Sequence, residues 1–323
     1  MSAERVLVLG AGGFLGRHLC TTLSAQGAEV IAVNRGARPV WAEGLSGLRW
    51  ESADFADTAR MAALTRGCGL VYHLVGGTSP ALSNAAPTDD LVNTLLNTVA
   101  WLEAIHGGVG GDVGGEVGGC AGLRRLVFVS SGGTVYGVPN ALPVAEEAPC
   151  EPICAYGIHK LAVEKYLALY RHLRGLDYGI LRVANPFGEG QISRHQQGVV
   201  AAFLRAARQG RPLEIWGDGQ VVRDYVYIGD VIDALLRAGR ADTLASRLFN
   251  IGSGSGRSLL EVAEAIEAVV GRPLERRFLP CRPADVPAIV LDVSRARRDL
   301  GWCASTPWRE ALARSWAWSR DNL

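Results

Sequence analysis

The chain has 323 residues, of which 48% are hydrophobic and 20% charged, and this composition excludes a disordered chain and allows a sizeable buried core. Its net charge of +1 excludes the broad basic field by which proteins hold nucleic acid or an acidic membrane surface. Its seven cysteines form no CxxC pair, no signal peptide is visible, and no apolar run approaches the ~20 residues of a membrane helix, so we expect a cytoplasmic protein without a metal site.

Short apolar runs of β type alternate with helical patterns through the first half of the chain. The runs lie at residues 6–9, 29–33, 70–74, 125–130 and 178–183. Strands that are apolar on both faces and separated by helices predict a parallel sheet covered on both sides. One connection, residues 107–122, consists largely of Gly-Gly pairs separated by Val, Asp and Glu, and we expect a flexible surface insertion there.

The pattern becomes less regular after Pro186. We predict a helix at 199–209, a strand at 213–216, and helices at 258–270 and 305–320. This half would form a smaller lobe that closes over the carboxyl edge of the sheet, where α/β folds bind ligands. The predicted boundary separates a first domain, 1–180, from a second, 181–323, some segments of which return to the first. Four tryptophans near the end of the chain are interpreted as packing residues: Trp302, Trp308, Trp316 and Trp318.

A glycine-rich loop, Gly10-Ala11-Gly12-Gly13-Phe14-Leu15-Gly16, follows the first predicted strand and opens a helix. Gly10 allows a tight turn, Gly13 lets the backbone approach a pyrophosphate, and Gly16 packs the helix against the strand. The N-terminus of the helix would stabilise the anion. The loop therefore predicts a dinucleotide site, in which we include the neighbouring Phe14 and Leu15.

The choice between NAD and NADP depends on the end of the second strand. A carboxylate that bonds the adenosine ribose is usual there, whereas this strand ends in Asn34 and Arg35, which leave room for a 2′-phosphate. NADP is therefore an alternative to NAD. Asp54 is placed either beside the adenine amine or in a plain turn, and Phe55 and Leu74 complete the predicted cofactor site.

Tyr156 and Lys160 begin a helix that runs to about residue 173. A spacing of four places the two side chains one turn apart on one face. A phenol with a pKa of ~10 is a poor base at neutral pH, and a fixed neighbouring ammonium favours its ionised form. Because only Lys160 and Lys165 are Lys in a chain that otherwise uses Arg, we interpret Lys160 as a tunable ammonium rather than half of a surface pair.

Several segments occur in the order typical of one family. They are the glycine loop, the Tyr-x-x-x-Lys pair, Ser130-Ser131-Gly132-Gly133-Thr134-Val135-Tyr136-Gly137, Leu181-Arg182-Val183-Ala184-Asn185-Pro186-Phe187-Gly188, Gly217-Asp218-Gly219-Gln220-Val221-Val222-Arg223-Asp224-Tyr225 and Arg282-Pro283-Ala284-Asp285-Val286-Pro287. Over essentially its whole length the chain resembles the extended short-chain dehydrogenase/reductase family, in its UDP-glucose 4-epimerase branch.

The resemblance implies an α/β protein with a Rossmann-type doubly wound parallel sheet and a smaller mixed α/β substrate-binding lobe. It implies an NAD-dependent enzyme that epimerises a UDP-linked hexose, in its plain or N-acetyl form, through a 4-keto sugar while NAD holds the hydride. Tyr156 would be the base that takes the O4 proton. Lys160 would lower its pKa and bond the nicotinamide ribose.

A hydroxyl side chain that assists at the sugar is the main departure from the family pattern. The expected position holds Gly132, so the hydroxyl would come from Ser131 or Thr134, of which we favour Ser131. The branch that eliminates water carries Asp-Glu after this position. Here Gly133 and Thr134 follow, which leaves no acid for elimination.

The resemblance also assigns substrate-binding residues in the smaller lobe. Arg223 and Arg282 match arginines that bind the diphosphate, and Asn185 matches an asparagine that bonds the same group. Surface ion pairs with neighbouring aspartates are the alternative for the two arginines. Ile289 falls where the family varies side-chain bulk beside the C2 substituent of the sugar, and its size would admit N-acetylated sugars.

Two other functions remain open at this stage. One is an NADP-dependent reductase of nucleotide-linked keto sugars, which Asn34 and Arg35 favour. The other is a catalytically silent dinucleotide-binding regulatory or scaffold protein, against which the retention of Tyr156 and Lys160 argues. The resemblance further implies a homodimer formed through helices at 89–105 and 156–173, and a role in polysaccharide biosynthesis.

Overall fold

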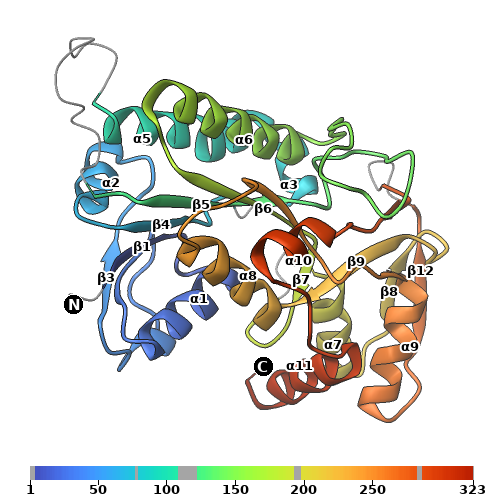
Figure 1. The fold of residues 1–323 in the computed structure, drawn as a ribbon. Coiled ribbons are helices and arrows are strands. Elements are labelled where there is room, and N and C mark those ends of the chain that lie inside the picture. The colour runs from blue at the N-terminus through green and yellow to red at the C-terminus, as the bar shows by residue number, and fades with distance from the viewer. Residues whose placement is uncertain (1–3, 77–78, 108–121, 193–197, 282–285, 323) are drawn as a thin grey trace. The chain divides into compact units, whose positions relative to one another are not determined.

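The computed structural model describes residues 4–76, 79–107, 122–192, 198–281 and 286–322 (Figure 1). They divide into two compact units, each made of several segments. The first takes its described residues from Met1–Ser130, Cys154–Leu181 and Ala238–Arg247, and the second from Ser131–Ile153, Arg182–Arg237 and Leu248–Leu323. Arg282 and most of the predicted insertion, 108–121, lie outside the described residues.

The main sheet has seven strands in the order β10-β6-β5-β4-β1-β2-β3. Their bounds are β1 (Arg5–Leu9), β2 (Glu29–Asn34), β3 (Leu48–Ser52), β4 (Leu70–His73), β5 (Arg125–Ser131), β6 (Tyr178–Val183) and β10 (Leu248–Ile251). The pairings from β3 through β2, β1 and β4 to β5 are parallel, and every residue of β4 and β6 is buried. The parallel sheet predicted from the apolar runs is confirmed. Because β4 lies beside β1, the strand order reverses there, which is where such sheets bind ligands.

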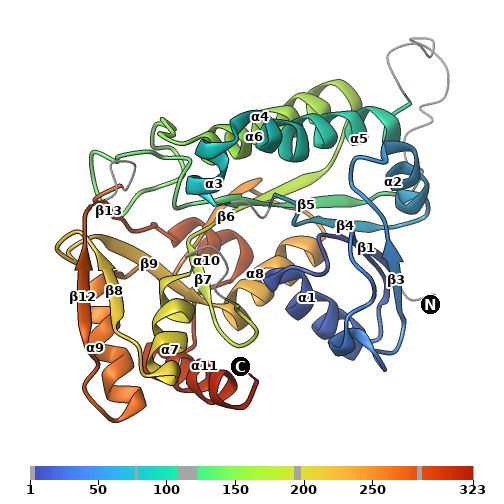
Figure 2. The ribbon, with the colours of Figure 1, turned by 180° about the vertical axis from the view of Figure 1, so that it is seen from behind.

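Helices of the first unit cover both faces of this sheet. They are α1 (Phe14–Ala25), α2 (Thr58–Thr65), α3 (Pro80–Ala85), α4 (Pro87–Asp90), the π-helical segment η2 (Leu91–Leu96), α5 (Asn97–Ile105) and α6 (Ala155–Arg174), with a short 3₁₀ turn η1 (Val40–Ala42). Figures 1 and 2 show α5 and α6 along one face and α1 across the other. The helix α6 ends at Gly175, whose φ of 70° suits glycine, and basic side chains in its last turn complement the helix dipole.

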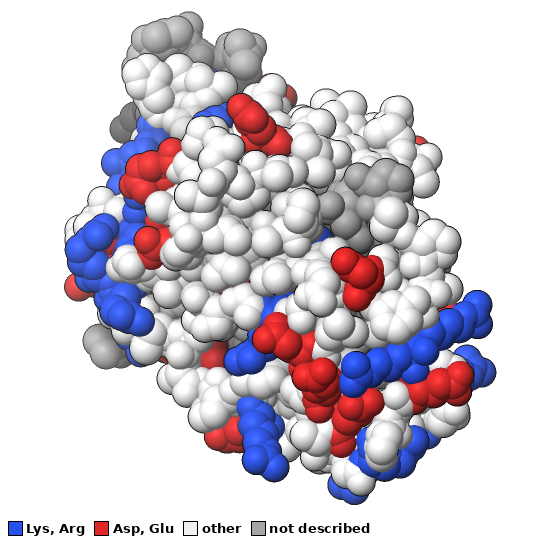
Figure 3. Space-filling model, turned by 90° about the vertical axis from the view of Figure 1, so that its right-hand side faces the viewer, with Lys and Arg blue, Asp and Glu red and all other residues white. Residues whose placement is uncertain are grey.

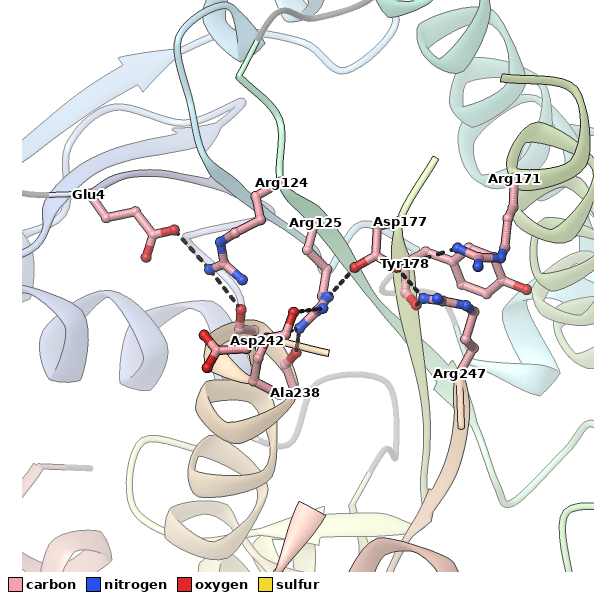
Figure 4. Close-up of polar contacts among 11 residues, drawn as sticks. Glu4, Arg124, Arg125, Arg171, Asp177, Tyr178, Ala238, Asp242 and Arg247 are labelled. Carbon is pink, nitrogen blue, oxygen red and sulfur yellow. Dashed lines mark hydrogen bonds and ion pairs between the residues drawn. The ribbon is translucent and has the colours of Figure 1, made fainter. Parts of the chain in front are cut away.

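A buried arginine on β5 ties three segments of the first unit together (Figure 4). The guanidinium of Arg125 donates to Asp177 Oδ2 at 2.6 Å and to the carbonyls of Ala238 and Ala241 at 3.0 and 2.6 Å. These carbonyls lie at and just beyond the end of α8 (Ile228–Arg240), where orphan carbonyl groups attract a cation. Arg247 and Arg171 also pair with Asp177, so the carboxylate holds three guanidinium groups.

The second unit contains two small sheets and its own core. Its remaining elements are β7 (Asn185–Phe187), α7 (Val199–Gln209), β8 (Leu213–Trp216), β9 (Val222–Tyr227), β11 (Gly256–Ser258), α9 (Leu259–Val270), β12 (Arg276–Leu279), β13 (Ala288–Ile289), α10 (Ser294–Leu300) and α11 (Trp308–Asn322). Strand β9 pairs with β7, β11 and β13, and β8 pairs with β12. Apolar side chains of α7, α9 and α11 form one buried cluster with side chains of β7, β8 and β9.

Three of the four tryptophans near the end of the chain serve packing, as expected. The Trp302 indole is buried and donates to the carbonyl of Asp230 at 2.9 Å. The Trp308 ring lies 5.0 Å from that of Phe187, and Trp316 packs against the same core cluster. Aromatic rings at these positions therefore stabilise the second unit.

Charged side chains of both signs are interspersed on the face drawn in Figure 3. This mixing agrees with the net charge of +1 and gives that face no field of a single sign. Across the described residues, no helix combines the length and apolar character needed to cross a membrane. The same residues contain no group of three metal-ligating side chains.

Candidate functional site

The loop between β1 and α1 leaves no room for side chains. Gly10 has a φ of 86°, and a Cβ there would lie 3.1 Å from the carbonyl carbon of Leu74. A Cβ on Gly16 would lie 2.3 Å from the oxygen of Gly10. Gly13 precedes α1 without a side-chain cap, so the first N–H groups of the helix are available to an anion. These glycines let the loop pack tightly against β4 and the start of α1, and with its uncapped N–H groups the loop fits the pyrophosphate of a dinucleotide.

The end of β2 reaches the same loop through Asn34. A Cβ on Gly12 would lie 2.7 Å from Asn34 Cγ, so the neutral amide contacts the glycine loop directly. Arg35 follows and is exposed. Phe14 and Leu15 are half-buried in the first turn of α1. Four predicted cofactor residues thus lie around one loop, next to the strand order reversal.

Of the other predicted cofactor residues, Leu74 borders this loop, whereas Asp54 and Phe55 make contacts elsewhere. Asp54 Oδ1 accepts the N–H of Ala56 at 2.9 Å, which is a turn contact. Phe55 is buried, and its ring lies 5.1 Å from that of His73, so this side chain belongs to the core. Leu74 follows β4 and borders Gly10 through its backbone. Roles in cofactor binding for these three residues stay predictions.

Lys160 brings a buried ammonium to the carboxyl ends of β4 and β5. Its Nζ donates to the carbonyls of Val75 at 3.1 Å and Val129 at 2.9 Å. Gly76 has a φ of 107°, and a Cβ there would lie 2.9 Å from Nζ, so glycine leaves the space that the ammonium uses. Burial lowers the pKa of Lys160 to about 8, while the carboxylates of Asp90 and Glu164 oppose that shift.

Tyr156 lies one helical turn before Lys160, as the spacing predicts. The Lys160 Nζ is 5.7 Å from the centre of the Tyr156 ring. Burial raises the pKa of the phenol, and the charges of Asp90 and Cys154 raise it further. The expected preference for phenolate beside the ammonium stays a prediction, because burial acts in the opposite direction in the protein alone.

The second unit explains why a hydroxyl is missing at position 132. A Cβ on Gly132 would lie 2.5 Å from Leu291 Cδ1 and 2.9 Å from the carbonyl oxygen of Arg182, so packing requires glycine. Ser131 ends β5 and is half-buried. Thr134 Oγ1 is buried and has no hydrogen-bond partner within the described part of the chain. An unpaired buried hydroxyl calls for an explanation, and a ligand would supply one.

A cavity of about 590 Å³ lies within the second unit. This volume is in the range of small-molecule sites, about 300–1,000 Å³. Residues that line it include Asn185, Trp216, Arg223, Tyr225 and Arg277. Two of the predicted substrate residues therefore share one concave site with aromatic and basic side chains.

The predicted substrate residues are held by backbone contacts. Asn185 Nδ2 donates to the carbonyl of Asp224 at 3.1 Å, and Arg223 Nη1 donates to the carbonyl of Val286 at 2.6 Å. Ile289 is buried in β13, in register with Arg223. Whether its side chain meets a sugar stays a prediction, as does the diphosphate role of Arg282.

Sequence reasoning missed Trp216, Tyr225 and Arg277 as cavity residues. The Tyr225 hydroxyl is buried without a partner in the described residues, which suggests a polar ligand. The alternation of β9 offered a signal, because residues two apart on a strand face the same side, as Arg223 and Tyr225 do. The register that sets Asn185 opposite Tyr225 had no signature in the sequence.

The sequence is similar to known enzymes over nearly its whole length. Residues 6–252 match the family described as the NAD dependent epimerase/dehydratase family. The chain is 35% identical over 324 residues to the UDP-glucose 4-epimerase of Mycolicibacterium smegmatis. This alignment covers 98% of the chain and 99% of the relative.

Solved structures share the fold. The UDP-glucose 4-epimerase of Thermotoga maritima, with UDP-glucose, is 29% identical, has a TM-score of 0.89, and is matched over 98% of this chain and 99% of that one. The UDP-glucose 4-epimerase of Thermus thermophilus, in complex with NAD, is 30% identical with a TM-score of 0.88, over 99% of this chain and 100% of that one. These similarities confirm the predicted Rossmann-type α/β class with a second, smaller sheet.

Proposed function

Because the chain belongs to the NAD-dependent epimerase/dehydratase family, we propose that it is a nucleotide-sugar epimerase that interconverts UDP-hexoses at C4 through a 4-keto sugar. The observation that carries the proposal is the position of Lys160. Its buried ammonium lies one turn from Tyr156, at the carboxyl ends of β4 and β5, next to the glycine loop. This arrangement supports an acid–base pair beside a dinucleotide cradle.

The residues around the loop would hold NAD, which supplies the hydride acceptor and donor when bound. Gly10, Gly13 and Gly16 give the pyrophosphate access to backbone N–H groups. The neutral Asn34 would meet the adenosine ribose. Lys160 would bond the nicotinamide ribose through its ammonium.

Tyr156 would take the proton of the sugar O4 hydroxyl and return it after the ring has turned over. The Lys160 ammonium would stabilise negative charge on the phenol oxygen and, with a pKa of about 8, remains largely protonated at neutral pH. A second hydroxyl from Ser131 or Thr134 would bond the same sugar oxygen. The unpaired Thr134 Oγ1 in the described residues now favours Thr134, where sequence reasoning favoured Ser131.

The second unit would bind the nucleotide part of the substrate. Its cavity contains Arg223 and Asn185 for the diphosphate, with Trp216 and Tyr225 as aromatic surfaces for a base. Arg282 would add a second guanidinium, and Ile289 would leave space for an N-acetyl group at C2. The first domain thus would serve the cofactor and the second the UDP-sugar.

A homodimer is supported by an apolar stripe on the first unit. Ile158, Leu169 and Leu173 are exposed on α6, and Val92 and Leu96 are exposed on the neighbouring η2. Exposed apolar stripes of this kind mark association surfaces. The mass from light scattering should be that of two chains for the wild type and of one chain for Leu169→Glu.

A reducing cytoplasm suits the described cysteines. Six of them are free thiols, of which Cys20, Cys68 and Cys154 are buried. Free thiols of this kind persist where the cell keeps them reduced. We therefore keep the cytoplasm as the proposed location, and localisation of a tagged chain would test it.

The function is tested with purified protein and a panel of UDP-, GDP- and dTDP-linked sugars, with the products identified by NMR. The proposal predicts interconversion of UDP-glucose and UDP-galactose, or of their N-acetyl forms, without net change in nicotinamide absorbance. Net consumption of NADPH would instead indicate a keto-sugar reductase. Absence of turnover with every UDP-sugar would overturn the proposal.

A further inference from the structure

A buried carboxylate contacts the first turns of α6, the helix that carries Tyr156 and Lys160. Asp90, the last residue of α4, is 2% exposed. Its Oδ2 accepts from Ser83 Oγ at 2.6 Å, its Oδ1 accepts from Thr94 Oγ1 at 3.1 Å, and His159 Nδ1 lies 2.8 Å from Oδ2. Because an ionised carboxylate only accepts, the hydrogen of the last contact is on His159 Nδ1.

These contacts join the elements that pack against the start of α6. Ser83 belongs to α3, Thr94 to η2, and His159 to α6 itself. A fourth contact adds to them, because the N–H of Ala155 donates to Asn84 Oδ1 at 2.9 Å and so caps the first turn of α6. The first two turns of α6 are therefore fixed through polar side chains as well as through packing.

His159 carries this constraint to the proposed catalytic pair. It lies three positions after Tyr156, so these two side chains share one helix face, and it directly precedes Lys160 in the backbone of α6. A rotation or shift of the first turns of α6 would break the contact between His159 and Asp90, so this contact resists movement of the backbone that positions both residues. A buried ion or hydrogen-bond pair at this point has an evident use in holding the helix in one orientation.

We propose that Asp90 is a positioning residue for the epimerase reaction, which it serves by fixing α6 through His159 and by setting the electric field at Tyr156 and Lys160. The inference rests on the proposed function. The effect of Asp90 reaches Tyr156 and Lys160 through α6 and through its charge. The substrate and cofactor classes are unchanged by it.

The charge of Asp90 shifts the pKa values of Tyr156 and Lys160 in the same direction. It raises the pKa of Tyr156, in addition to the larger effect of burial, and it raises the pKa of Lys160 against the lowering by burial. A negative charge disfavours phenolate and favours ammonium, which explains the common sign. Neutralising Asp90 should therefore lower both pKa values.

Other titratable groups face Tyr156 and Lys160, and a variant that neutralises Asp90 leaves these groups unchanged. Glu164, on α6, accepts from Ser130 Oγ at 2.5 Å and raises the pKa of Lys160. Cys154, just before α6, raises the pKa of Tyr156. His73 on β4 has its pKa lowered to about 3 by burial and by the Lys160 charge, and so remains neutral at working pH.

The test is the pH profile of kcat for the wild type and Asp90→Asn. The amide keeps the shape and two acceptor contacts but removes the charge. We expect both limbs of the profile to move to lower pH by about 1 unit, the size of shift that a nearby charge produces. If both limbs of the profile stay at their wild-type pH while the maximal kcat falls, Asp90 has a purely structural role and the inference is overturned.

A matched control is Asp89→Asn, which removes the same charge from the neighbouring, exposed position. Its limbs should coincide with those of the wild type, and an equal shift in this variant would overturn the inference. If Asp90→Asn does not fold, the double variant Asp90→Asn, His159→Asn replaces the pair by two amides that can bond each other. The same shift is expected from it.

A second readout does not need turnover. The tyrosinate absorbance of Tyr156 is obtained as the difference between a protein and its Tyr156→Phe form during a pH titration. This difference should titrate at lower pH in the Asp90→Asn background than in the wild type. If the wild type epimerises no nucleotide sugar, the proposed function fails, whereas an unmoved tyrosinate titration defeats the role of Asp90 alone.

Discussion

The first unit buries two cations in different ways. Arg125 is 1% exposed and bonds the carboxylate of Asp177 together with carbonyls at the end of α8. Lys160 is 2% exposed and donates to two carbonyls, while its carboxylate neighbours act on it through their charge. A guanidinium stays charged wherever it is placed, whereas an ammonium can be tuned by burial. The comparison indicates that direct pairing serves stability, and that a tunable cation serves chemistry.

The largest expected effect comes from Lys160→Met. Loss of the ammonium should lower kcat by about 10²–10⁴-fold, the size of an acid–base contribution. The free energy of unfolding should change little, because removing a buried charge without a direct ion pair in the described residues offsets the loss of a donor to two carbonyls. Activity assays and urea unfolding of the same preparation measure both. A marked loss of stability with little loss of kcat would reverse the roles assigned to the two cations.

The matched change at the other cation is Arg125→Met. Here the unfolding free energy should fall by about 1–3 kcal/mol, because carbonyls at the end of α8 lose their donor, while Asp177 keeps two other guanidinium partners. Any folded fraction should keep the wild-type kcat, since Arg125 is not part of the proposed site. Urea midpoints and kcat at low temperature test this, and a large fall in kcat per folded molecule would break the comparison.

A smaller effect concerns stability at alkaline pH. The folded protein releases the Lys160 proton near pH 8, whereas the unfolded chain keeps it to its usual pKa of 10.5. Between these values the unfolded state binds more protons, so the contribution of Lys160 to stability should rise with pH. The difference in melting temperature between the wild type and Lys160→Met isolates this contribution. It should change in favour of the wild type from pH 8 upward, and a constant difference would contradict the lowered pKa.

Much of the fold was predictable because its signals are local. Strands buried on both faces give short apolar runs, and those at β1, β4 and β6 lie within a residue of their predicted bounds. The glycine loop and the Tyr156–Lys160 spacing are also local patterns. The second unit was less predictable, since β9 gains its partners β7, β11 and β13 from distant segments.

The parts of the site that escaped prediction depend on contacts between distant residues. Asp90 and His159 are 69 positions apart, so neither residue alone indicates the pair. The sequence reveals glycine at position 132 but gives no reason for it, because the reason is the side chain of Leu291. Tyr225 enters the cavity through strand register, which the sequence does not encode in a readable pattern.

The central claim is that the Tyr156 phenol is the proton acceptor of the reaction. The most direct measurement compares kcat and NAD affinity of the wild type and Tyr156→Phe, which removes one oxygen from a residue of α6. The account predicts that turnover is abolished, a loss of at least about 10²–10⁴-fold, while NAD binds as tightly as before. Unchanged turnover in Tyr156→Phe would contradict it.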